Sequence, residues 1–266
     1  MGVSLSTARW LAPASFVYNF AAQIYGMTAK PNMADVHDAN LSFWSPYPYF
    51  IAGFFSVQQI AQVVWMYRLW KLNASKPKEA EELKPVVKFV PYYALGNACI
   101  GTWMFFWNSS MLKTSNVFVV INSLAQLYYV FTQLDRMNTA STSSVLTHIV
   151  SKTFAGIGVL DLVHNGSIAY FKDVYPGTAV KVLTAVGFGG LALVSDWIFG
   201  ACLVYDLVAL SVGQGIYTSK EWSSLLGAYA VGTAAIVGLR NWALPPYYRK
   251  TDGYYAVGQD EIDDRA

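Results

Sequence analysis

The stretch AVKVLTAVGFGGLALVSDWIFGACLVYDLVALSV, residues 179–212, is apolar almost throughout and yet contains two acids, Asp196 and Asp206. A third acid, Asp161, stands in a similar apolar run at residues 146–171. A carboxylate at membrane depth costs roughly 2.5–3.5 kcal/mol on insertion scales, so it normally turns inward, pairs or serves a function. These acids therefore predict a membrane protein with a polar interior.

Apolar runs of this kind follow one another along the chain. A helix needs about 20 apolar residues to cross the hydrocarbon of a bilayer. On this basis we expect about seven spans, at residues 8–26, 47–70, 86–107, 115–134, 146–171, 179–212 and 222–240. The predicted fold class is all-α, a polytopic transmembrane helix bundle over residues 1–245, followed by a polar, disordered tail at 246–266.

The sixth run has an unusual length. At about 1.5 Å per residue it is too long for one upright span, and it is too short for two spans and a turn. We expect one tilted helix that extends beyond the bilayer and bends near Gly187, Gly189 and Gly190.

Composition agrees with a multi-pass membrane location. The chain has 266 residues, of which 55% are hydrophobic and only 13% are charged, whereas soluble domains contain about 25% charged residues. The net charge of +2 is too small to indicate nucleic acid as a partner. The lysines between residues 71 and 88 favour a cytoplasmic N-terminus. The run after Arg9 is interpreted as a span, with a cleaved signal peptide as the alternative.

Side-chain amides and tryptophans mark the second and third predicted spans. Gln58 and Gln62 are four residues apart and share a helix face. Asn97 lies deep in the third span, and Trp103 and Trp107 are again four apart. Such amides either join neighbouring helices or form the wall of a polar ligand site, and Trp107 has the position of an interface anchor.

The acids permit two interpretations. Asp161 and His164 are three residues apart, close enough for a hydrogen bond that either relays protons or pins two helices. Asp196 and Asp206 lie about 15 Å apart along a helix axis, so each needs a partner from another helix, with His164, Arg240 or an amide as candidates. Two acids at different depths fit a path for ions or protons, and equally two separate interhelical pins.

Motifs for catalysis and cofactors are missing from the sequence. It contains no G-x-S-x-G, P-loop or H-E-x-x-H motif. We therefore predict that the chain is not an enzyme and has neither a metal site nor a cofactor. Cys99 and Cys202 both fall in apolar runs and are interpreted as buried thiols.

The order of several segments is familiar. NFAAQIYG at 19–26 is followed by FWSPYPYF at 43–50, by an amide-rich span ending in WMYRLW, and by an Asn97 to Trp103 to Trp107 pattern. This order resembles the tryptophan-rich sensory protein/translocator protein group, in particular a seven-helix branch in fungi. The resemblance implies a cavity for a porphyrin, a sterol or another flat hydrophobic molecule, with Asn97 and Trp103 in the group's Asn and Trp positions. Asp161, Asp196 and Asp206 are not part of the group's pattern.

Three hypotheses about function follow. The leading one is binding or transport of a hydrophobic or amphipathic molecule, porphyrin-like or sterol-like, in a cavity lined by Gln58, Gln62, Asn97, Trp103, Asp161 and His164. The second is an ion- or proton-coupled transporter that uses the acids, with Asp196 and Asp206 on the path. The third is a membrane scaffold or assembly factor. The expected partners are the lipid bilayer, the small molecule and, as an open alternative, further copies of the chain.

Overall fold

The chain folds as an all-α protein in the computed structural model, which describes residues 3–243. This confirms that the fold is all-α, whereas the predicted tail at 246–266 lies outside the described residues. Within the described range there are nine α-helices and one short π-helical segment, η1 (Tyr129–Gln133), which continues α5. The α-helices are α1 (Leu5–Thr28), α2 (Met33–Ala39), α3 (Pro48–Lys71), α4 (Pro77–Asn108), α5 (Leu112–Tyr128), α6 (Thr142–Tyr170), α7 (Thr178–Leu193), α8 (Trp197–Tyr217) and α9 (Lys220–Ala243).

Four of these helices are long and apolar enough to cross a membrane, namely α3, α6, α8 and α9. They suggest a multi-pass membrane protein, but the prediction of about seven spans is wrong. Two helices are too short, since α5 has 17 residues and α7 has 16. In α1 and α4, side-chain amides, hydroxyls and aromatic residues interrupt the apolar sequence.

The long apolar run at 179–212 is two helices and not one bent helix. The chain leaves helical geometry between α7 and α8, and Gly187, Gly189 and Gly190 lie inside α7. Asp196 caps α8, because its carboxylate accepts a hydrogen bond of 3.1 Å from the backbone N–H of Phe199. The Arg240 side chain of α9 donates to the carbonyl of Leu193 at the end of α7. The cap from Asp196 and the hydrogen bond from Arg240 of α9 therefore stabilise the break between α7 and α8. The apolar pattern of the sequence does not reveal this break.

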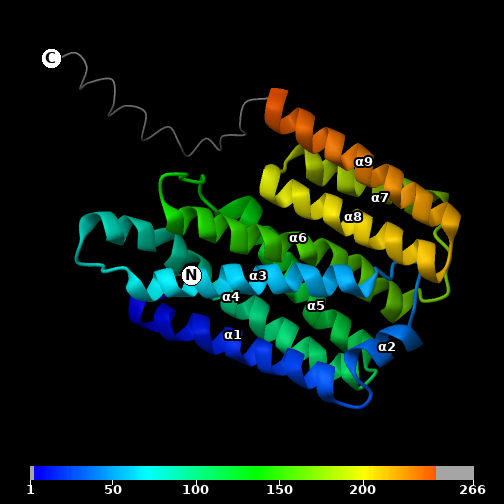
Figure 1. Cartoon of the computed structure of the whole chain (residues 1–266), viewed down its shortest axis with the longest axis horizontal. Helices are drawn as coiled ribbons and strands as arrows, with labels where there is room; N and C mark the ends of the chain where they lie inside the picture. Colours follow the sequence, from blue (N-terminus) through cyan, green and yellow to red (C-terminus); the bar gives the residue numbers. More distant parts are fainter. Residues whose placement is uncertain (1–2, 244–266) are drawn as a thin grey trace.

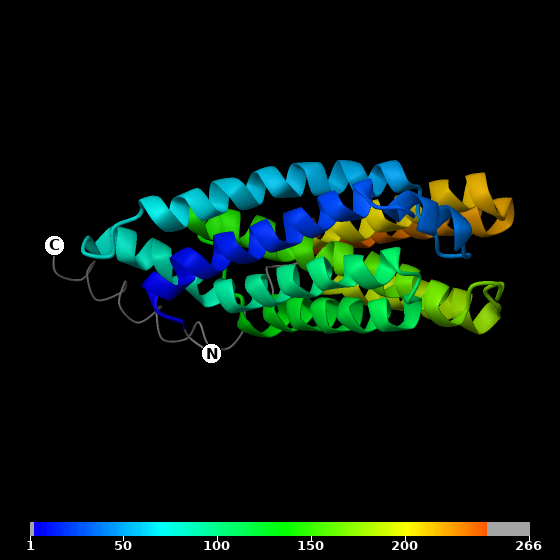
Figure 2. The same ribbon diagram turned by 90° about the horizontal axis from the view of Figure 1, so that it is seen from below.

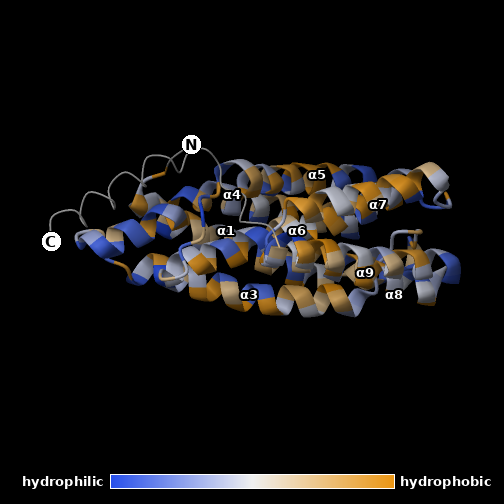
Figure 3. Ribbon diagram, turned by 90° about the horizontal axis from the view of Figure 1, so that it is seen from above, coloured by the Kyte–Doolittle hydropathy of each residue, from blue (hydrophilic) through white to orange (hydrophobic). Residues whose placement is uncertain are grey.

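The long helices run along one common direction and reverse from one to the next (Figures 1 and 2). In Figure 1, α1, α4 and α5 lie on one side and α7, α8 and α9 on the other. Between these groups lies α6, which contacts α3, α4, α5 and α8. Hydrophobic residues make up much of the ribbon of α3 and α7 (Figure 3). Val57, Ile60 and Leu183 are each at least two thirds exposed, as is expected for a surface that faces lipid.

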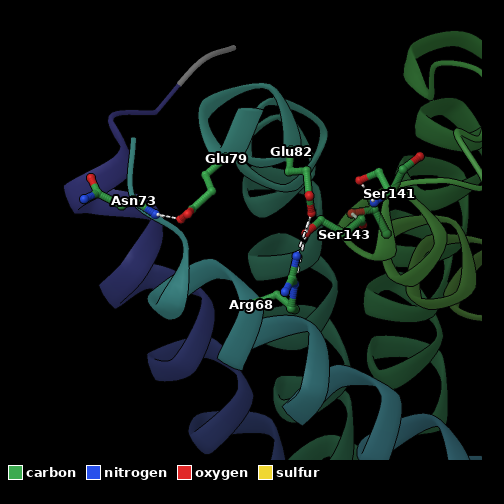
Figure 4. Close-up of polar contacts among 8 residues, drawn as sticks. Arg68, Asn73, Glu79, Glu82, Ser141 and Ser143 are labelled. Atoms are coloured by element: carbon green, nitrogen blue, oxygen red, sulfur yellow. Dashed lines mark hydrogen bonds and ion pairs between the residues drawn. The ribbon is translucent and has the colours of Figure 1, made fainter. Parts of the chain in front are cut away.

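Polar contacts join three helices at the end of the bundle that carries the 71–88 lysines. The guanidinium of Arg68 on α3 donates to the carboxylate of Glu82 on α4 at 2.6 Å. The hydroxyl of Ser143 on α6 donates to the same carboxylate at 2.9 Å (Figure 4). Because one carboxylate links three helices, this network fixes the spacing of α3, α4 and α6 at that end.

Glycines allow the closest approaches. A Cβ atom added to Gly156 of α6 would lie 2.3 Å from the Cβ of Cys202 on α8, and one added to Gly213 would lie 2.3 Å from the carbonyl oxygen of Ser45. Cys202 and the second cysteine of the chain, Cys99, are both free and buried, as predicted. The segment before α3 thus rests directly on the backbone of α8, and this contact holds residues 41–47 over the end of the bundle.

We predict that Gly213→Ala lowers the free energy of unfolding by at least about 1–3 kcal/mol, the usual cost of overpacking, because the new methyl group meets backbone atoms. Gly232→Ala is the matched control, since nothing lies within 4 Å of its added Cβ. Thermal unfolding of both variants in detergent measures the difference. Equal midpoints for the two variants would contradict the close contact.

Candidate functional site

Two of the predicted ligand residues, Gln62 and Asn97, belong to one chain of hydrogen bonds. The Tyr93 hydroxyl donates to Gln62 Oε1 at 2.7 Å. Asn97, on the same helix, donates to the Tyr93 carbonyl and accepts from the side chain of Asn19 on α1 at 2.9 Å. Gln58 lies apart from this chain, and its Nε2 donates to Thr153 of α6 at 3.3 Å. These contacts show that Gln62 and Asn97 hold α1, α3 and α4 together.

Trp103 and His164 lie at the opposite end of the bundle from the lysine loop. The indole N–H of Trp103 donates to Asn165 Oδ1 at 2.8 Å, and its ring packs against Trp107 with centroids 5.2 Å apart. The six predicted ligand residues are therefore divided between different networks.

The predicted hydrogen bond between Asp161 and His164 does not form. His164 Nδ1 instead lies 3.1 Å from the carbonyl oxygen of Trp44. The physical reason is the position of residues 41–47, which bring a backbone carbonyl to the imidazole. Residues three apart on a helix point in directions about 60° apart, and the Asp161 side chain has a different neighbour.

That neighbour is Asp206 of α8, whose charge interacts with that of Asp161. Asp206 is fully buried, and neither of its carboxylate oxygens has a hydrogen-bond partner. Asp161 is partly exposed, and no side chain or backbone group among the described residues donates to its carboxylate. None of the partners predicted for Asp206 contacts it. Two acids from two candidate spans are thus brought together without compensating donors.

Asp196 has a different role from Asp206. Its carboxylate forms an ion pair with Lys152 of α6 and caps α8 at the same time. Lys152 is only 11% exposed at its side chain, so this pair ties α6 to the break between α7 and α8. The sequence was compatible with two roles for Asp196, a step on an ion path or a pin that joins two helices. The contacts of Asp196 are those of a pin.

Titratable groups follow α6 along most of its length. They are His148, Lys152, Asp161 and His164, the first and last of which are 16 positions or about 24 Å apart along the helix. The charges of Lys152 and Asp196 both act on His148. At the other end the rings of His164 and His37 are 5.6 Å apart. All four residues lie in the span predicted at 146–171, whereas the contacts that extend the row to Asp196 and His37 connect residues far apart in the chain and were not predictable from the sequence.

His37 was missed by sequence reasoning, although a local signal was present. Asn32 and Asp35 form a capping box, in which each side chain accepts from the backbone N–H of the other residue. This pattern is a helix start, and it marks a short helix in the segment between the first two predicted spans. The helix, α2, carries His37 to the end of α6.

A shallow apolar groove lies between α6 and α7. Its volume is about 300 Å³, near the lower end of small-molecule sites. The lining residues are Trp44, Val159, Val163, Val180, Leu183, Thr184, Gly187, Phe188 and Leu191. None of the six predicted ligand residues lines it. Among residues 3–243, no three His, Cys, Asp or Glu side chains come together as metal ligands.

Comparison with family models, with curated proteins and with solved structures finds no match to this chain. The resemblance to the tryptophan-rich sensory protein/translocator protein group thus rests on the quoted segments alone.

We predict that dicyclohexylcarbodiimide, an apolar reagent for protonated carboxyl groups, labels Asp161 and spares Asp196. Two like charges in apolar surroundings do not both ionise, so the Asp161 and Asp206 pair retains a proton, whereas the carboxylate of Asp196 is engaged in its ion pair with Lys152. Peptide mass spectrometry of the labelled chain measures both positions. Equal labelling of Asp161 and Asp196 would contradict this assignment.

Proposed function

We propose that this chain is a multi-pass membrane protein that moves protons or couples proton movement to the transport of a solute, with the Asp161 and Asp206 pair at its centre. The observation that supports the proposal most directly is the buried carboxylate of Asp206, whose oxygens have no hydrogen-bond partner of normal geometry among the described residues, although the backbone of Leu160 lies near, and on which the charge of Asp161 also acts. A group with this cost inside a membrane is retained for a function by default.

The energetics favour exchange of a proton over a structural role. A buried pin between helices needs a donor opposite each carboxylate, as Lys152 provides for Asp196. Asp206 has none, and the nearby acid destabilises its charged form further. The Asp161 and Asp206 pair therefore does not stabilise the contact between α6 and α8. It can, however, accept and release one proton with little rearrangement of the surrounding helices.

The remaining titratable groups extend the pair toward both ends of α6. His148 and the Lys152–Asp196 ion pair lie toward one end, and His164 and His37 toward the other. Gaps between them are wider than a hydrogen bond, so water molecules would have to complete the path. The Asp161 and Asp206 pair would then lie between an entrance that contains His148 and an exit that contains His164 and His37, or the reverse.

We predict that reconstituted vesicles acidify or alkalinise when a membrane potential is imposed, as reported by an enclosed pH-sensitive dye. Asp206→Asn removes the exchangeable proton and should reduce the flux to the level of protein-free vesicles, while Asp206→Glu retains part of it. Asp173→Asn is the control, because Asp173 is an exposed loop residue. Wild-type flux in Asp206→Asn, or no flux in the wild type with or without candidate solutes, would refute the proposal.

A second function has a specific observation in its favour. The groove between α6 and α7 is apolar and bordered by Trp44, which suits a flat hydrophobic or amphipathic molecule of the porphyrin or sterol type. The resemblance of the sequence to the tryptophan-rich sensory protein group points to the same ligand class. The ligand would then lie in this groove and not among Gln58, Gln62 and Asn97, whose hydrogen bonds are largely used between helices.

We predict that Gly187→Phe fills this groove and weakens binding of a porphyrin or a sterol in a fluorescence titration. The substitution fits, because nothing lies within 4 Å of a Cβ at Gly187. Gly190→Phe is the matched control on the same helix, since it is equally unobstructed and does not line the groove. Identical binding curves for the two variants would exclude the groove as the ligand site.

The scaffold hypothesis remains a prediction. Part of it depends on the acidic tail, which lies outside the described residues.

A further inference from the structure

Two of the three histidines in the chain meet at the end of the bundle. The imidazole of His37 on α2 and that of His164 on α6 have ring centroids 5.6 Å apart and planes inclined at 48°. Each residue is 8% exposed. The third histidine, His148, lies sixteen residues before His164 on α6 and takes no part in this contact.

The hydrogen bond of His164 fixes which of its nitrogens is free. A carbonyl oxygen can only accept, so Nδ1 must donate its proton to Trp44, and the neutral ring then carries its lone pair on Nε2. A backbone carbonyl that accepts from one imidazole nitrogen while the other is left for a metal is the usual arrangement around metal-binding histidines.

His37 contributes the second free nitrogen. Its Nε2 atom is buried and has no hydrogen-bond partner, a condition that costs about 1–3 kcal/mol for a polar group. Burial lowers the pKa of His37 below its ordinary value of 6.5, against an opposing effect of Asp38. The ring is thus neutral at pH 7, which is the form that binds metals.

We propose that His37 and His164 form a two-histidine site for a borderline divalent cation such as Zn²⁺, Cu²⁺ or Ni²⁺. With metal–nitrogen bonds of about 2.0–2.1 Å, each ring centroid lies roughly 3.2 Å from a shared ion. Centroids 5.6 Å apart then correspond to an angle of about 120° at the metal, within the range of trigonal and distorted tetrahedral coordination.

The surroundings agree with a cation at this position. The carboxylate of Asp38 acts electrostatically on His37. The ring of Tyr217 packs against the His37 ring, with centroids 5.9 Å apart. No third His, Cys, Asp or Glu of the described residues converges here, so water completes the coordination. Such a site holds α2 onto α6 when it is occupied, because the two ligands come from separate elements.

The test is a titration of the purified full-length chain with CuCl₂, ZnCl₂ and NiCl₂. The Trp107 ring is 6.1 Å from that of His164, so bound Cu²⁺ quenches its fluorescence, and calorimetry follows Zn²⁺ and Ni²⁺. We expect one saturable equivalent, with affinity at least about tenfold lower in His37→Gln and in His164→Gln. His148→Gln should bind like the wild type. This binding assay involves no transport, so its outcome is independent of proton flux.

Either of two results overturns the proposal, namely the absence of a saturable equivalent in the wild type, or wild-type affinity in His37→Gln. His37 lies on a short helix outside the candidate spans, which keeps the test valid if His164→Gln fails to fold. Affinity should also fall once the solution is acidic enough to protonate the ligand imidazoles, and burial lowers the pKa of His37, so this fall lies below the ordinary imidazole value of 6.5.

Discussion

Close packing around α6 is the constraint on which the rest of the structure depends. This helix contacts α3, α4, α5 and α8, and two glycines allow the nearest approaches. Gly156 faces Cys202 of α8, and Gly158 faces Ser123 of α5. Without these glycines a side chain would keep the neighbouring helices apart. Small residues have this effect in membrane bundles generally, where backbone proximity replaces the hydrophobic effect as a source of stability.

The polar residues that this packing encloses fall into two physical classes. Amides such as Gln62 and Asn97 find partners on neighbouring helices and stabilise the contact. Asp206 finds none, and Asp161 adds a like charge nearby. A polar group in apolar surroundings must be satisfied or must be neutral. Gln62 and Asn97 meet the first condition, whereas an amide such as Gln58 keeps its oxygen without a hydrogen-bond partner. An amide carries no charge, and the acid pair must be neutral to meet the condition at all, which is why the functional proposal rests on the acids.

Particular residues show how far the sequence could be interpreted. The apolar runs identified most helices, and the unusual acids were correctly singled out. The break at Asp196 was missed because apolar residues continue on both sides of it, and the caps come from Asp196 itself and from Arg240. The partner of His164 was missed because it is a backbone carbonyl, which every residue has and no pattern marks. Seven spans were expected because the runs that form α1, α4 and α5 also resemble spans and because α7 and α8 were interpreted as one, though four of the described helices meet the criterion.

The sequence by itself determined that this chain is helical, that it is rich in apolar surface, and that it contains acids whose burial costs free energy. These properties follow from composition and spacing. Tertiary structure alone decided the partners. It joined Asp161 to Asp206, assigned Asp196 to Lys152 and brought His37 against His164. Helical periodicity fixes the face of its own helix on which a side chain lies. Which residues of a neighbouring helix that side chain meets depends on how the helices pack, and those residues decide whether an acid joins two helices or exchanges protons.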